Sequence, residues 1–99
     1  MPNTELELRF NDLEVMWKKD TEETSSIREI ITHPAYEEIM RMGEEAVPFI
    51  LRSFQKEIDH WAPALMTIVQ VNPVPRESAG KMEKIRDAWI KWGRENRYI

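Results

Sequence analysis

The sequence predicts an all-α fold of about five helices in one domain that spans residues 1–99. Apolar residues recur at steps of three and four along most of the chain, and prolines and glycines stand where such segments begin and end. No segment alternates convincingly between polar and apolar residues, as a half-buried strand would. With 99 residues, 41 % of them hydrophobic, and four tryptophans, the chain can build one small core.

The first helix is expected at residues 4–19. Leu6, Phe10, Leu13 and Trp17 follow one another at steps of four, three and four, which places them on one face. The polar run at 20–26 breaks this pattern and predicts a loop.

A capping box opens the next, short helix. The Ser26 hydroxyl is expected to accept the backbone N–H of Glu29, whose side chain reaches back to the start of the helix. This helix should end by His33, because a proline disfavours helical geometry in the residue before it. Pro34 then suits the first position of a further helix, capped by His33 or Thr32.

Gly43 is expected to end that helix, and the following one begins with Glu44 and Glu45 at the positive end of its dipole. Pro48 falls in its first turn, where the missing N–H does little harm. The expected buried stripe of this helix consists of Val47, Ile50, Leu51 and Phe54.

Two more helices complete the prediction. Asp59 is the expected N-cap of the first, which turns Trp61, Leu65 and Ile68 inward. The segment 71–76 contains two prolines and is expected to be a loop. The last helix is placed at residues 78–96, with an inner face of Met82, Ile85, Trp89 and Trp92. A strand at residues 68–71 is the alternative to this interpretation.

Charge is unevenly distributed over a chain of net charge −4. Residues 1–24 hold seven acidic and three basic groups, for a net charge of −4. Residues 25–75 hold seven acidic and four basic groups, for −3, whereas residues 76–99 hold four acidic and seven basic groups, for +3. The absence of cysteine excludes disulfides, thiolate metal sites and cysteine nucleophiles. The polar N-terminus does not resemble a signal peptide, and no apolar run reaches the ~20 residues of a membrane span. We therefore expect a cytoplasmic protein without membrane contact.

Catalytic motifs are not apparent in the sequence. Phosphate-binding and dinucleotide-binding glycine patterns and a serine elbow are all missing. His33 and His60, with Glu37, Glu38 or Asp59, could form a metal site or an acid–base pair, although capping and packing explain both histidines more simply. We expect no enzymatic activity, no metal and no cofactor, with a metal-dependent enzyme as the remote alternative.

The function that the sequence favours is binding of another protein, as an adaptor or regulator. The candidate contact residues are Tyr36, Arg52, Trp61 and Tyr98. One alternative is nucleic-acid binding by Lys84, Lys91 and Arg94 of the basic last helix. Another is an acidic inhibitor that mimics nucleic acid. The sequence leaves the oligomeric state open.

Two resemblances extend this interpretation. The run Met42-Gly43-Glu-Glu-Ala46-Val47-Pro48-Phe49-Ile50-Leu51 resembles the turn and second helix of a HEAT-like repeat. This implies a helix A near 34–42, a helix B near 44–55, and a second, incomplete repeat from Trp61.

Over residues 10–98 the whole chain also resembles a family of small, uncharacterised bacterial proteins. This second resemblance implies no activity and no catalytic residues. It rests on the series Trp17, Glu23-Thr24-Ser25-Ser26, His33-Pro34-Ala35-Tyr36, Met42-Gly43, Pro48, His60-Trp61, Ala64-Leu65, Pro73, Gly80, Trp89 and Trp92-Gly93.

Overall fold

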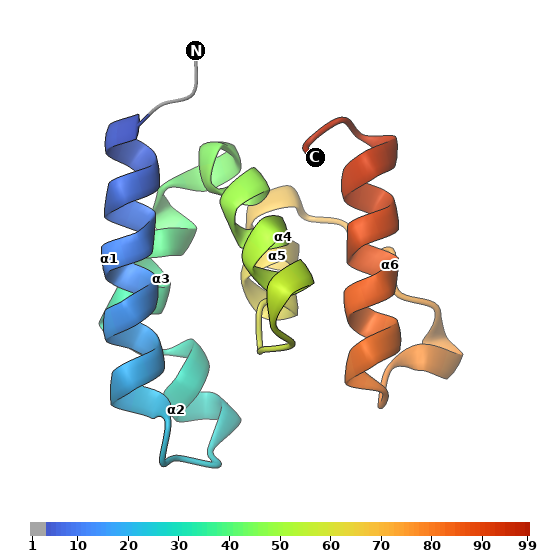
Figure 1. Cartoon of the computed structure of the whole chain (residues 1–99). Coiled ribbons are helices and arrows are strands. Elements are labelled where there is room, and N and C mark those ends of the chain that lie inside the picture. The colour runs from blue at the N-terminus through green and yellow to red at the C-terminus, as the bar shows by residue number, and fades with distance from the viewer. Residues whose placement is uncertain (1–3) are drawn as a thin grey trace.

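All regular structure is helical in a computed structural model of the chain, which describes residues 4–99 (Figure 1). Over that range no strand forms, so the predicted all-α class is confirmed and the alternative strand at 68–71 is wrong. The helices are α1 (Thr4–Thr21), α2 (Ile27–Ile31), α3 (Pro34–Arg41), α4 (Val47–Lys56), α5 (Ala62–Val69) and α6 (Met82–Glu95), with the short 3-10 helices η1 (Gly43–Ala46) and η2 (Arg76–Ser78).

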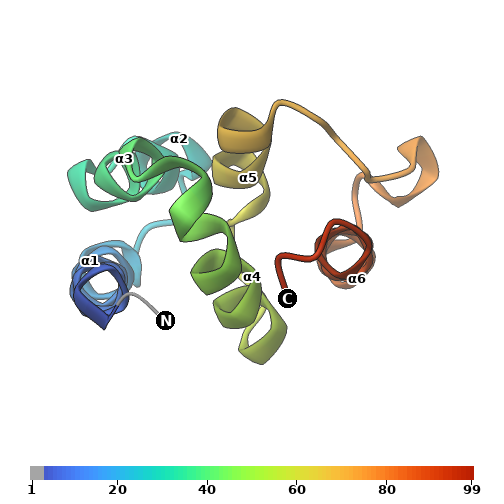
Figure 2. The same ribbon diagram turned by 90° about the horizontal axis from the view of Figure 1, so that it is seen from above.

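The helices form a flat arrangement in which α1, α4 and α6 lie across one side, with α4 in the middle (Figures 1 and 2). Helices α3 and α5 lie behind them. Helix α1 packs mainly on α3, α3 on α5, and α4 on α6. The molecule measures 37 × 34 × 22 Å along its principal axes. This layout leaves one side of α4 free of other helices.

An aromatic cluster joins α1, α3 and the start of α5. The rings of Trp17 and Trp61 lie 4.6 Å apart between centroids, and Tyr36 stacks on Trp61 at 5.8 Å with an interplanar angle of 12°. The Trp17 indole N–H donates to the backbone carbonyl of Ile30 at 2.8 Å, which holds α2 against α1. Phe10 completes the cluster at 5.8 Å from Trp61. Such aromatic pairs add to the stabilisation that area burial supplies.

The predicted apolar stripes form the rest of the core. Val47, Ile50, Leu51 and Phe54 of α4 are fully buried, as expected. On α6 only Trp89 of the four predicted inner residues is fully buried, and the remaining three are partly exposed.

Helix ends follow the local signals at the centre of the chain. His33 Nδ1 accepts the backbone N–H of Ala35 at 3.0 Å, which confirms it as the cap of α3. Gly43 has φ +72°, the left-handed conformation that suits a glycine after a helix end. The Ser26 hydroxyl accepts the Glu29 N–H as predicted, whereas the Glu29 carboxylate accepts from the Thr24 hydroxyl instead of reaching back to Ser26.

Three helix starts differ from the prediction, and α1 runs to Thr21, two residues beyond its expected end. The segment after Gly43 begins as the 3-10 helix η1, and α-helical geometry starts only at Val47, one residue before Pro48. Asp59 does not cap α5, because its carboxylate accepts the N–H of the adjacent His60 and the helix starts at Ala62. The last helix begins at Met82 rather than residue 78, since residues 76–78 form the separate 3-10 helix η2.

Among residues 4–99, no helix combines the length and the apolar character that crossing a membrane requires.

Candidate interaction surface

Two of the predicted contact residues, Tyr36 and Trp61, are fully buried, which counts against a role for either in contacting a partner. The Tyr36 hydroxyl donates to the His60 carbonyl at 2.7 Å and accepts the Ala64 N–H at 2.9 Å. The start of α5 has no side-chain cap, so this hydroxyl takes the place of one and holds the ring inside. Burial raises the pKa of Tyr36 above its ordinary value. Trp61 lies within the aromatic cluster.

Tyr98 holds the C-terminal residues in place. Its ring stacks on Trp92 with centroids 5.2 Å apart, and its hydroxyl donates to the Glu44 carboxylate at 3.3 Å. Partial desolvation and the Glu44 carboxylate raise the pKa of Tyr98. The residue is only partly exposed, and the side chain already has partners. Of the four predicted contact residues, Arg52 alone is exposed and makes no ion pair with any residue in the range 4–99.

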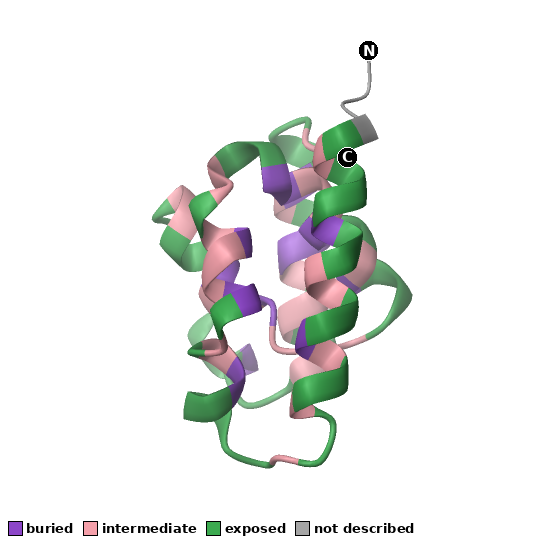
Figure 3. Cartoon of the chain, turned by 90° about the vertical axis from the view of Figure 1, so that its left-hand side faces the viewer, coloured by how far each residue is buried: buried purple, intermediate pink, exposed green. Residues whose placement is uncertain are grey.

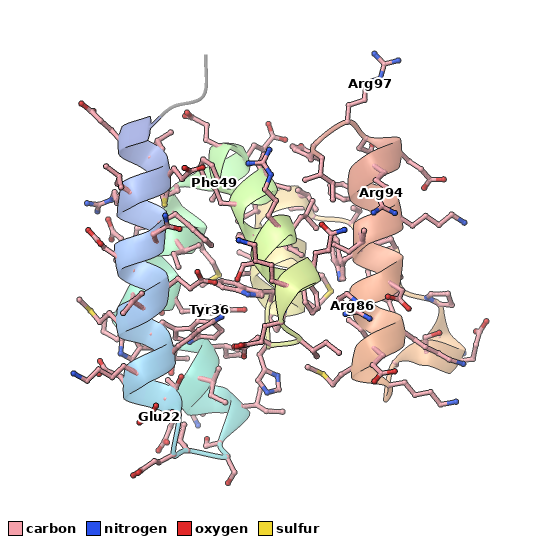
Figure 4. All side chains as sticks on the ribbon, in the orientation of Figure 1. Glu22, Tyr36, Phe49, Arg86, Arg94 and Arg97 are labelled. Atoms are coloured by element: carbon pink, nitrogen blue, oxygen red, sulfur yellow. The ribbon has the colours of Figure 1, made fainter. Side chains whose placement is uncertain are left out.

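A groove of about 410 Å³ runs between α1 and α4. Phe10 and Phe49 provide its apolar surface, and Figure 4 shows Phe49 between the two helices. Arg52 and Lys56 line it from α4, one helical turn apart on the same outward side. Glu7 and five further polar residues complete the lining: Asn11, Glu14, Lys18, Ser53 and Glu57.

Ion pairs neutralise part of this groove. The Ser53 hydroxyl donates to the Glu14 carboxylate, and the Lys18 ammonium lies 3.5 Å from Glu14 and 3.2 Å from Glu57. Lys18 is therefore compensated by two acids. Arg52 and Lys56 are exposed and have no acidic partner among residues 4–99.

A second groove, of about 350 Å³, lies on the other side of α4, against α6. Its lining residues are Gln55, Arg86, Asp87, Ile90, Lys91 and Arg94. Figure 4 shows Arg86 between α4 and α6, with Arg94 further along α6. Arg86 pairs with Asp87 at 2.8 Å, which leaves Lys91 and Arg94 exposed and unpaired over the part of the chain described.

The three residues of the nucleic-acid alternative share one side of α6. Lys84, Lys91 and Arg94 are all exposed, and Lys84 and Lys91 line a third groove with Trp92 and the loop prolines. Asp87 lies between them on the same side, and Glu83 and Glu95 flank them. The positive surface of α6 is therefore interrupted by acids.

The two histidines have separate structural partners. His33 Nδ1 caps α3 while its Nε2 lies 2.9 Å from the Asp20 carboxylate, so both ring nitrogens are engaged. His60 contributes its backbone N–H to Asp59 and its carbonyl to Tyr36. Within residues 4–99, no three His, Cys, Asp or Glu side chains are grouped so that they could hold a metal ion.

Sequence reasoning missed Lys56, although a signal for it exists. The segment that forms α4 carries Arg52 and Lys56 and no acidic residue, in a chain with 18 acidic residues. A helix that carries cations alone gives them no acidic partner within the helix itself.

No protein-family model matches the chain, and no curated protein or solved structure matches it either. The grooves beside α4 are therefore interpreted from their geometry and charge.

Proposed function

We propose that the protein is a helical binding module that recognises an acidic, amphipathic segment of another protein. The binding surface, termed the α4 face, consists of the exposed cations Arg52, Lys56, Lys91 and Arg94 together with the apolar residues Phe49 and Ile90 in the two grooves. The observation that carries the proposal is that these four cations have no acidic partner within residues 4–99 of a chain of net charge −4.

Uncompensated cations destabilise the free protein slightly. A like-charged pair one turn apart, such as Arg52 and Lys56, costs about 0.2–0.5 kcal/mol on a helix. Carboxylates of a partner would relieve this repulsion. They would also accelerate encounter, because complementary charge steers association.

A protein partner suits the α4 face better than nucleic acid does. The partly exposed Phe49 gives the groove between α1 and α4 apolar surface for a partner's side chain, and the second groove is lined in part by Ile90, which is 6 % exposed. Glu7 and Asp87 lie at the same grooves and would repel a continuous phosphate backbone. A partner that places carboxylates and apolar side chains at separate positions avoids this repulsion, as an amphipathic acidic helix does.

We also propose that residues 34–55 form a HEAT-like unit. In support, the left-handed Gly43 separates α3 from the segment that leads into α4, and Pro48 lies in the first turn of α4. In HEAT-like arrays such units expose a ridged surface to protein partners, which is the role assigned here to α4.

The experiment is a pull-down from host lysate with and without nuclease, comparing wild type with two variants of equal charge. The first variant removes the α4-face cations: Arg52→Gln, Lys56→Gln, Lys91→Gln and Arg94→Gln. The control removes four other exposed cations that form no ion pair within residues 4–99: Lys19→Gln, Arg28→Gln, Arg76→Gln and Lys81→Gln. Both carry the same net charge, since each loses four positive groups.

We expect a protein that is retained stoichiometrically by wild type and by the control variant and is lost by the α4-face variant. Equal capture by all three would contradict the proposal. Capture that disappears with nuclease would replace the protein partner with nucleic acid.

A further inference from the structure

Helix α1 has an apolar outer side that no other part of residues 4–99 covers. Leu8, Val15 and Met16 are 58 %, 66 % and 51 % exposed, although they are large hydrophobic residues. They recur at i, i+7 and i+8, on the side of α1 away from the buried Phe10 and Trp17. Figure 3 shows exposed positions along this outward side of α1.

The surroundings of this apolar side are acidic. Glu5 and Asp12 are exposed beside it on α1, and Glu22 and Glu23 are exposed at the foot of the helix, which Figure 4 shows for Glu22. Of the cations nearby, Arg9 pairs with Glu38 at 2.5 Å, whereas Lys19 is exposed one helical turn from Val15 and Met16, so four acids surround one exposed cation that forms no ion pair within residues 4–99. The outer side of α1 is thus an amphipathic, acidic helix surface.

This surface has the composition that the α4 face requires. The α4 face offers four cations without an ion pair in residues 4–99, beside grooves that are polar apart from Phe10 and Phe49 in one and Ile90 in the other. The outer side of α1 offers exposed acids around exposed apolar side chains. The α4 face opens onto the two grooves beside α4, whereas Leu8, Val15 and Met16 lie on the side of α1 away from the buried Phe10 and Trp17, so the two surfaces can meet only between copies. Such a contact joins two different patches and is head-to-tail.

Resting on the proposed function, we propose that one partner of the α4 face is a second copy of the chain, which docks through Leu8, Val15 and Met16 of its α1. A contact made by one helix face belongs among small interfaces, below about 1,200 Å² in total. The association is therefore weak and depends on protein concentration. Because the contact leaves an α4 face free at one end and an α1 free at the other, it can extend to oligomers.

The test is sedimentation velocity on the full chain and on two complementary variants. Lys91→Glu with Arg94→Glu inactivates the α4 face, and Leu8→Lys with Val15→Lys inactivates the outer side of α1. All four positions are exposed, so the variants keep the core. Ile27→Lys is the control, because Ile27 is an equally exposed hydrophobic residue, 54 %, outside both surfaces.

For wild type and the control we expect a mass that rises from the 11.8 kDa monomer with concentration and returns to it at about 0.5 M NaCl. Each double variant alone should associate at least about tenfold more weakly. An equimolar mixture of the two should form a dimer and stop there, because only one productive contact is left.

Three results would overturn this inference: a wild-type monomer at all concentrations up to about 1 mM, variants that associate like wild type, or a mixture that remains monomeric. None of them bears on the lysate pull-down, so the α4 face could still bind a different acidic protein. Conversely, if the α4-face variant captured the lysate partner as well as wild type does, the proposed function would be refuted, whether or not the chain associates with itself.

Discussion

Replacing Tyr36 with phenylalanine tests how α5 is held in the fold. The substitution removes only a hydroxyl, which donates to the His60 carbonyl and accepts the Ala64 N–H. The Ala64 N–H is buried at the uncapped start of α5 and loses its acceptor, whereas the carbonyl of the half-buried His60 can turn to water. A buried donor left unsatisfied costs about 1–3 kcal/mol, so we expect a loss of about 2 kcal/mol.

The assay is thermal unfolding followed by circular dichroism, with urea unfolding to confirm the free energy. For a domain of this size, about 2 kcal/mol corresponds to a fall in Tm of roughly 8–16 °C. The matched control is Tyr98→Phe, which removes a longer hydroxyl bond at a partly exposed site and should change stability by less than about 0.5 kcal/mol. If Tyr36→Phe were as stable as wild type, the Tyr36 hydroxyl would not be serving as the cap of α5.

Three further predictions concern stability. Gly93→Ala should cost about 1–2 kcal/mol in urea unfolding, because its Cβ would lie 2.5 Å from the buried Leu51 side chain, whereas Gly80→Ala has open space and should be neutral. Arg97→Gly should raise stability by about 0.5–1 kcal/mol, since Arg97 has φ +63° after α6, and Arg97→Ala should give no gain. Burial raises the pKa of Tyr36, so the unfolded chain loses that proton first, and wild-type stability should fall as the pH rises past about 10. Tyr36→Phe should show a smaller alkaline loss, and an identical loss would mean that other groups cause it.

The helices could be predicted because their signals are local. The stripe of α4, the cap at His33 and the stop at Gly43 each depend on residues within a turn or two. The boundaries that differed have a physical reason as well. The Asp59 carboxylate accepts the backbone N–H of its neighbour His60. From the sequence alone, an aspartate that bonds in this way looks the same as one that caps a helix by accepting an N–H two or three residues later.

The burial of aromatic residues could not be predicted in the same way. Tyr36 is buried because its hydroxyl finds partners 24 and 28 residues further along the chain, and only the folded structure brings them together. Exposed and buried aromatics near helix ends therefore look alike in the sequence.

The α4 face could be predicted only in part. Arg52 was identified from the sequence, and Lys91 and Arg94 were identified for a different ligand. Their common surface depends on the packing of α4 against α6. The two helices pack closely at Gly93 of α6, where a Cβ would meet the Leu51 side chain of α4. The spacing of residues along the chain does not reveal this contact between the helices.

The most direct test of the α4 face is zero-length cross-linking of the captured complex with a carbodiimide, which joins lysine amines to carboxylates in contact. Lys56 and Lys91 lie on the α4 face, and the equally exposed Lys19 and Lys81 lie outside it. We predict cross-links from Lys56 and Lys91 to aspartate or glutamate of the partner, identified by mass spectrometry. Cross-links to the partner confined to Lys19 and Lys81 would contradict the account.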